Sequence, residues 1–229
     1  MNIWNDLCDF FFPRLCLTCG EKLLLYEEGL CLKCLSELPK AQILRTSNNE
    51  MEARLWSHSN FQRASALYYY EKGGKVSKIL QGMKYQHRGQ LCEQMGRLIA
   101  TELKPTNFFK GIDYLIPVPL HPARLRQRGY NQSELLCNGI SQITHIPIVT
   151  NALVRVHNNA TQTHKSSSQR WQNAHGLFAP TSQSVKLSNK HILFVDDVFT
   201  TGSTLSACIT ALSTVESIQA SVLTLAYAK

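Results

Sequence analysis

The segment ILFVDDVFTTGST, residues 192–204, constrains the fold more than any other part of this chain of 229 residues. Four apolar residues end abruptly in two adjacent carboxylates, a turn of Thr, Gly and Ser follows, and apolar residues then recur at helical spacing. The pattern predicts a buried strand, a tight loop and the N-terminus of a helix. Because ligands bind at the carboxyl ends of strands in open α/β sheets, it also predicts a ligand site.

The predicted loop has two chemically different halves. Backbone N–H groups at a helix N-terminus, with Thr and Ser hydroxyls beside them, suit a phosphate. Asp196 and Asp197 would repel a phosphate, but carboxylates accept hydrogen bonds from vicinal sugar hydroxyls. A sugar with a 5′-phosphate therefore satisfies both halves. The alternative is an ordinary strand-to-helix turn in which the aspartates cap the helix.

Strand and helix patterns alternate from residue 61 onward. Apolar runs predict strands at residues 64–70, 114–120, 147–156, 191–197 and 221–228. Helical spacing predicts helices at residues 76–83, 91–99, 131–143 and from Ser203 onward. This alternation predicts an α/β fold with a mostly parallel sheet flanked by helices.

Four cysteines near the N-terminus form two C-x-x-C pairs, Cys16 with Cys19 and Cys31 with Cys34. Two such pairs place four thiolates around one Zn²⁺, and a metal with every position filled has a structural role. A redox dithiol, which needs only one pair, is the alternative. The other four are expected to be packing residues: Cys8, Cys92, Cys137 and Cys208.

Composition separates three segments. Residues 1–40 are a zinc-ribbon-like four-cysteine module, residues 41–60 a polar linker with a short helical turn, and residues 61–229 the α/β domain. No apolar run approaches the roughly 18 to 20 residues that span a bilayer. The apolar start lacks a basic region and a cleavage site, so we expect a cytoplasmic protein. Peripheral contact with the inner face of the membrane is the alternative.

Basic residues dominate one half of the chain, which carries a net charge of +8. Between Tyr114 and Val195 the only acidic residue is Glu134. The basic residues there are Arg124, Arg126, Arg128, Arg155, Lys165, Arg170, Lys186 and Lys190. Such a region suits a polyanion, either a small polyphosphate or a nucleic acid. The alternative is a solvated basic face without a ligand.

Residues 192–204 resemble the signature of type I phosphoribosyltransferases that binds 5-phosphoribosyl 1-pyrophosphate (PRPP), although Phe199 is bulkier than the usual aliphatic residue. The cysteine pairs, the stretch YYYEKGGKVSKILQGMKYQHRGQL, the stretch VPLHPARLRQRGYNQSELL and the polar residues 158–178 precede this signature. Together, and in this order, they resemble the ComF family. That family is tied to competence, the uptake of single-stranded DNA in natural transformation.

The resemblance implies roles for particular residues. Asp196 and Asp197 would hold the ribose hydroxyls. The 5′-phosphate would be bound by Val198, Thr200, Thr201, Gly202, Ser203 and Thr204. The pyrophosphate would be bound by a loop or short turn that contains Leu120, His121, Arg124, Arg126 and Arg128. A loop closing over the substrate would contain Gln162, Lys165, Arg170 and Asn173, unless that stretch is only a surface loop.

Two functions follow from the resemblance. The first is transfer of a phosphoribosyl group from Mg²⁺-bound PRPP to an unidentified acceptor, with release of pyrophosphate. The second is handling of single-stranded DNA, together with other DNA-uptake proteins, with PRPP as a ligand or regulator. A catalytic residue cannot be assigned. Related phosphoribosyltransferases are often dimers, but no interface can be identified in the sequence.

Overall fold

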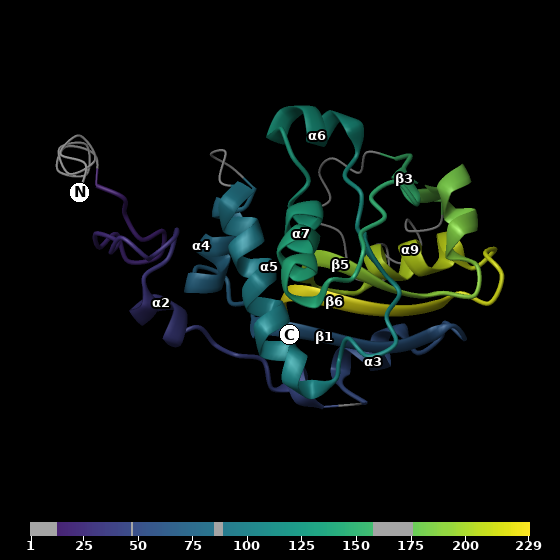
Figure 1. The fold of residues 1–229 in the computed structure, drawn as a ribbon, viewed down its shortest axis with the longest axis horizontal. Coiled ribbons are helices and arrows are strands. Elements are labelled where there is room, and N and C mark those ends of the chain that lie inside the picture. Colours follow the sequence, from purple (N-terminus) through teal and green to yellow (C-terminus); the bar gives the residue numbers. More distant parts are fainter. Residues whose placement is uncertain (1–12, 47, 85–88, 158–175) are drawn as a thin grey trace.

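A computed structural model describes residues 13–46, 48–84, 89–157 and 176–229. Within these residues, four strands form a parallel sheet in the order β1-β6-β5-β2 (Figure 1). These strands are β1 (Phe61–Tyr69), β2 (Tyr114–Pro117), β5 (His191–Phe199) and β6 (Gln219–Tyr227). The predicted α/β fold with a mostly parallel sheet is confirmed.

Helices cover both faces of the sheet because alternate residues of each strand point to opposite sides. Leu193 and Val195 of β5 pack with one set of helices, whereas Ile192 and Phe194 pack with the other. The first set is α4 (Lys75–Gly82), α5 (Gly89–Leu103) and α7 (Gln132–Thr144), which lie side by side in Figure 1. The second set is α3 (Glu50–Leu55) and α9 (Ser203–Leu212).

Helices α5 and α7 cross at two glycines. A Cβ atom added at Gly96 would lie 2.2 Å from the carbonyl oxygen of Leu136, and one added at Gly139 would lie 2.1 Å from that of Glu93. Both distances are far below van der Waals contact. The two backbones therefore touch, and only glycine fits at either position.

The segment predicted as a linker is more structured than its composition indicates. It contains η1 (Gln42–Arg45) and α3, and the start of α3 carries a capping box between Asn49 and Glu52. Met51 and Leu55 of α3 are fully buried. The segment therefore belongs to the core, and its polar residues form caps and buried hydrogen bonds.

The arginine-rich stretch was expected to be a loop or short turn, but the structure makes it a helix, α6 (Pro122–Arg128). Pro122 occupies the first turn, where its missing N–H group costs nothing, and the His121 ring accepts a hydrogen bond from the Ala123 N–H group. Because no residue of α6 is buried, its arginines do not need to share one face.

Other boundaries also differ from the predictions. The strand expected at residues 147–156 is reduced to β3 (Leu153–Arg155), which pairs antiparallel with β4 (Phe178–Pro180). Strand β5 continues beyond the two aspartates to Phe199. The remaining short helices are α2 (Leu32–Ser36), η2 (Lys104–Thr106) and η3 (Ser182–Leu187). Among the described residues, every helix falls short of the length and apolar character that crossing a bilayer requires.

Candidate functional site

The predicted ligand loop lies where the sheet topology favours a crevice. Strands β2 and β5 are neighbours, but β2 leads through α6 to α7 on one face of the sheet, and β5 leads to α9 on the opposite face. Such a switch between neighbouring parallel strands opens a crevice at their carboxyl ends, where ligands of α/β proteins bind. The aspartate pair and α6 therefore flank the same edge of the sheet.

The loop after β5 turns sharply into α9. Gly202 is the N-cap of α9 and has a φ of 83°, in the left-handed region that favours glycine. The hydroxyl of Thr201 bonds the hydroxyl of Ser203 at 3.0 Å and accepts the Ser203 N–H at 3.4 Å. Gly202 has no side chain to cap α9, and the Ser203 N–H is the one N–H group of its first turn for which the described residues show a side-chain acceptor. The strand, tight loop and helix predicted for this segment are confirmed.

The aspartate pair is only partly accessible to solvent. The Oδ1 atom of Asp196 accepts hydrogen bonds from the Ser133 hydroxyl at 3.0 Å and from the Asp197 N–H group at 2.9 Å. Burial, followed by repulsion from Asp197, raises the pKa of Asp196 from 3.8 to about 7. The charge of this carboxyl therefore changes near neutral pH.

One lysine that the sequence analysis did not single out forms an ion pair with an aspartate of this pair. The Nζ atom of Lys84, just after α4, lies 2.9 Å from Oδ2 of Asp197. Both side chains are largely shielded, with exposed fractions of 27% and 12%. No local pattern predicts this contact, because the two residues belong to distant elements.

A second basic residue near the site, Arg155, was noted only as part of the positive charge. Its guanidinium lies over the ring of Phe178, 5.6 Å from the centroid. Burial lowers its pKa, repulsion from Arg124 lowers it further, and attraction to Asp196 opposes both. Arg155 thus interacts electrostatically with both Asp196 and Arg124, and a site with arginines from two elements suits an anion with several charges.

Helix α3 contacts the ligand loop and the neighbouring strand β6. Arg54 donates a hydrogen bond to the carbonyl oxygen of Thr200 and lies 5.4 Å from the ring centroid of Tyr227. The Tyr227 hydroxyl donates to Glu50 at 2.6 Å, and the His58 ring and the Ser206 hydroxyl are 2.8 Å apart. The loop is therefore held by residues of the segment that was predicted to be a linker.

The residues predicted to bind pyrophosphate lie at the end of β2 and on α6. Leu120 and His121 are half-buried, and the His121 ring caps α6. Arg124 and Arg128 are half-buried, whereas Arg126 is exposed. The residues predicted for the substrate loop, Gln162, Lys165, Arg170 and Asn173, lie outside the described residues.

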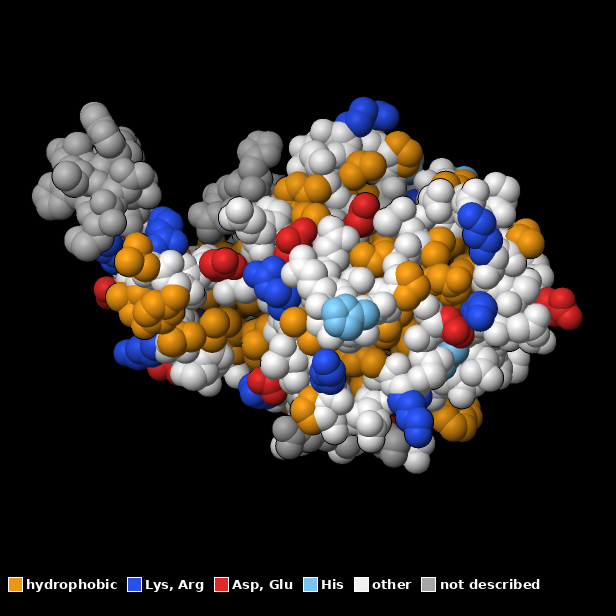
Figure 2. Space-filling model, viewed as in Figure 1, with side chains coloured by type: hydrophobic (Ala, Val, Ile, Leu, Met, Phe, Trp, Pro, Cys, Tyr) orange, Lys and Arg blue, Asp and Glu red, His pale blue; other side chains and the backbone are white. Residues whose placement is uncertain are grey.

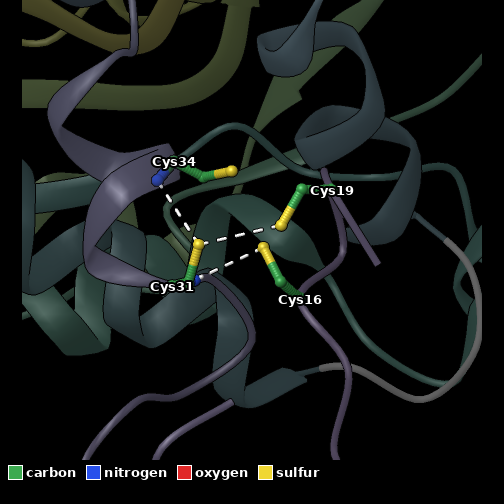
Figure 3. A group of neighbouring side chains, drawn as sticks. All are labelled: Cys16, Cys19, Cys31 and Cys34. Carbon is green, nitrogen blue, oxygen red and sulfur yellow. Dashed lines mark hydrogen bonds between the residues drawn. The ribbon is translucent and has the colours of Figure 1, made fainter. Parts of the chain in front are cut away.

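The four paired cysteines converge in space, as Figure 3 shows. Their sulfur atoms all lie within 4.8 Å of one another, and the Cys19 and Cys31 sulfurs are 3.8 Å apart. Four sulfurs at about 2.3 Å from a tetrahedral zinc are separated by about 3.8 Å. The cluster therefore fits a metal ion with four thiolate ligands.

The surroundings of Cys16 favour its thiolate, whereas the pKa values of Cys19 and Cys31 are raised, because burial and the neighbouring thiols outweigh the backbone donors at those two sulfurs. The Cys31 N–H group donates to the Cys16 sulfur at 3.3 Å, and the Thr18 hydroxyl lies 3.2 Å from the same atom. Burial raises the pKa of Cys16, but these hydrogen bonds and others from the knuckle backbone outweigh it and lower the pKa to about 5. Donors of this kind are the supporting contacts that stabilise metal-bound thiolates.

The four-cysteine cluster is attached to the domain through α4. Lys78 donates to the carbonyl oxygen of Thr18 at 3.0 Å, and Lys75 pairs with Glu37. Gly82 packs against Leu17, so closely that an added Cβ atom would lie 2.5 Å from Leu17 Cδ2.

No protein-family model matches the chain. Competence protein F of Haemophilus influenzae is 28% identical over 206 residues, which cover 86% of this chain and 89% of that protein. DNA utilization protein YhgH of Escherichia coli strain K12 is 28% identical over 205 residues, or 85% and 88% of the two chains. Competence protein ComFC of Bacillus subtilis is 34% identical over 91 residues, 40% of this chain and 34% of that protein. These homologues support a protein of the ComF family.

Proposed function

We propose that this ComF-family protein binds PRPP, as its magnesium complex, at the carboxyl ends of β2 and β5. The observation that carries the proposal is the order of groups at the carboxyl end of β5. The acceptor pair, Asp196 and Asp197, lies near the end of β5 and is followed, after Val198 and Phe199, by the loop at Gly202 and the start of α9. Acceptors for vicinal hydroxyls and donors for a 5′-phosphate thus stand next to each other, as one phosphorylated ribose requires.

The pyrophosphate of the ligand would lie toward α6 and β3. The groups assigned to it are Leu120, His121, Arg124, Arg126 and Arg128, to which the structure leads us to add Arg155. Support comes from the electrostatic interactions of Arg155, which is repelled by Arg124 of α6 and attracted to Asp196. Magnesium bound to the ligand supplies further neutralisation of the pyrophosphate oxygens.

The chemistry that suits this site is phosphoribosyl transfer. An acceptor attacks C1 of the ribose while the C1–O bond breaks and its electron pair leaves with pyrophosphate. This reaction asks the protein mainly to hold the ribose, shield it from water and stabilise the leaving charge. The acceptor is unidentified, so no general acid or base is assigned.

We further propose that the protein acts in DNA uptake. The names of its homologues and the basic character of residues 114–195 favour this role. Figure 2 shows hydrophobic side chains gathered over the surface where Figure 1 places α2. The exposed apolar residues of this part of the chain are Leu15, Leu24, Leu25, Tyr26 and Leu32. A surface of this kind favours contact with a partner protein.

Titration of Mg²⁺-PRPP by calorimetry, with pyrophosphate release assayed in the same samples, tests the proposal. The double variant Asp196→Asn/Asp197→Asn should abolish binding. Asp113→Asn is the matched control, because Asp113 precedes β2 at the opposite end of the sheet. Release of pyrophosphate that depends on single-stranded DNA would show that phosphoribosyl transfer and DNA handling are coupled. Binding without release would favour a DNA-handling protein regulated by PRPP, and no binding by the wild type would refute the site.

A further inference from the structure

Lys84 is the one basic residue seen in direct contact with the aspartate pair among the described residues. Its Nζ atom reaches Oδ2 of Asp197 at 2.9 Å, and the contact is largely shielded from solvent. An ion pair in such surroundings is screened less than one on the surface. The contact leaves Oδ1 of Asp197 for other partners.

The backbone around Lys84 is anchored on several sides. The preceding residue, Met83, is completely buried, and its carbonyl oxygen accepts a hydrogen bond from the Tyr130 hydroxyl at 2.9 Å. The Lys84 N–H group donates to the Gln81 carbonyl oxygen at 3.0 Å. Gly82 is wedged against Leu17 of the four-cysteine cluster. The backbone of Lys84 is therefore held in place at the side of the site.

We propose that Lys84 is the positioning residue of the aspartate pair: its ammonium group holds Asp197 and favours the ionised form of both carboxylates, so that they accept hydrogen bonds from a ribosyl ligand. The inference rests on the proposed PRPP site and deepens it. A protonated carboxyl donates a hydrogen bond instead of accepting two, so a pair that keeps a proton matches vicinal hydroxyls poorly.

Among the described residues, the other groups that interact with the pair do not supply the same direct positive contact. They are Ser133, Arg155 and the thiols of Cys92, Cys137 and Cys208. Burial raises the pKa of all three thiols, so they are neutral near pH 7. Arg155 is attracted to Asp196, but among the contacts of the described residues Lys84 alone forms an ion pair with the aspartates. Two adjacent carboxylates resist joint ionisation, and a cation in direct contact lowers that resistance.

The test compares the wild type with Lys84→Met, Lys84→Arg and Lys78→Met. Lys78 is the matched control, because it lies on α4, the helix that leads to Lys84, and its ammonium group donates to the carbonyl oxygen of Thr18 instead of to the aspartates. Mg²⁺-PRPP is titrated by calorimetry between about pH 6 and pH 9, a range that spans the Asp196 transition. Titration of the PRPP phosphates is common to all variants and cancels in the comparison.

Lys84→Met should weaken binding of Mg²⁺-PRPP about tenfold at pH 7, because a carboxylate that gains a proton no longer serves as a charged hydrogen-bond acceptor. The midpoint of its pH profile should move up by about one unit. Lys84→Arg should restore both, and Lys78→Met should match the wild type. Equal losses in Lys84→Met and Lys84→Arg without a pH shift would show a merely structural role and overturn the inference.

A second measurement does not depend on the ligand. Carboxyl ¹³C NMR of the free protein follows the titration of Asp196 directly, and its midpoint should rise in Lys84→Met. An unchanged midpoint would overturn the inference about Lys84 whether or not PRPP binds. Absence of PRPP binding in the wild type, with a shifted midpoint in the variant, would instead refute the proposed ligand and leave the role of Lys84 in charging the pair supported.

Discussion

Phe199 and Gly202 are packed so closely that a Cβ atom added at Gly202 would lie 2.7 Å from Cζ of Phe199. Phe199 is fully buried and lies edge-on to Tyr227, with 5.9 Å between ring centroids. The large ring at this position therefore forms the floor of the ligand loop. It makes glycine necessary at position 202 for a steric reason as well as for its positive φ.

The first prediction concerns this contact. Gly202→Ala should lower the free energy of unfolding by about 1–3 kcal/mol and weaken PRPP binding, because it adds both backbone strain and a clash. Gly129→Ala is the matched control, since Gly129 has a φ of 79° but nothing within 4 Å of an added Cβ atom. Urea unfolding measures the free energy of unfolding of both glycine variants, and calorimetry measures PRPP binding. Phe199→Leu in the Gly202→Ala background should recover the difference, and equal losses at the two glycines would contradict the contact.

The second prediction concerns Asp196, whose pKa is raised from 3.8 to about 7 by burial and by Asp197. Stability from this group is present below pH 3.8 and is lost as the pH rises through about 7, because the folded state holds a proton that the unfolded chain has released. Asp196→Asn removes this pH dependence. Above pH 7 the variant should melt a few degrees higher than the wild type, at about 2–4 °C for each kcal/mol.

The same variant should fail to bind PRPP, so stability and ligand binding should move in opposite directions. The Asn side chain can still accept a hydrogen bond from the Ser133 hydroxyl, so a packing defect would not explain the loss of binding. Thermal melts at several pH values, with Asp113→Asn as control, measure the effect. A variant less stable than the wild type above pH 7 would show that the buried charge is compensated in the folded protein.

The third prediction concerns the four-cysteine cluster. The purified protein should contain about one zinc per chain, and Cys31→Ser should lose it, because a tetrahedral site needs all four thiolates. Chelation should lower the melting temperature, since metal binding and local folding are linked. Cys92→Ala, which removes a buried thiol outside the cluster, should keep its zinc. Elemental analysis decides between these outcomes, and zinc retained in Cys31→Ser would exclude the four-cysteine site.

The fourth prediction concerns the helix crossing. Gly139→Ala should destabilise the protein by about 1–3 kcal/mol, because its methyl group would collide with the backbone of α5. Gln142→Ala, an exposed change on the same helix, should alter stability little. Urea unfolding of the two variants provides the measurement. A neutral Gly139→Ala would mean that the helices can separate without loss.

Much of the central architecture could be predicted because it depends on short, local patterns. The apolar run before Asp196 can only be a buried strand, and Asn131 caps α7 as an N-cap residue should. The spacing of the paired cysteines likewise indicates their convergence in space. In each case the information lies within about a dozen neighbouring residues.

The errors arose where tertiary contacts override local composition. Helix α3 looks like linker because its polar residues are used internally: Glu52 accepts the Ala64 N–H group, and Arg54 reaches Thr200. Lys84 and Arg155 are brought to the site by tertiary contacts between elements that are distant in the sequence. Helix α6 was missed because three arginines were assumed to need one helix face, whereas Arg124 and Arg128 are half-buried and Arg126 is exposed.

The glycine crossing of α5 and α7 limits how the molecule can move. Because the two backbones touch at Gly96 and Gly139, neither helix can roll or slide without carrying the other. Ser133, near the start of α7, is hydrogen-bonded to Asp196, so this rigid pair also fixes one wall of the crevice. Any opening or closing around a ligand must therefore arise elsewhere, with α5 and α7 serving as the stationary frame against which the other parts are displaced.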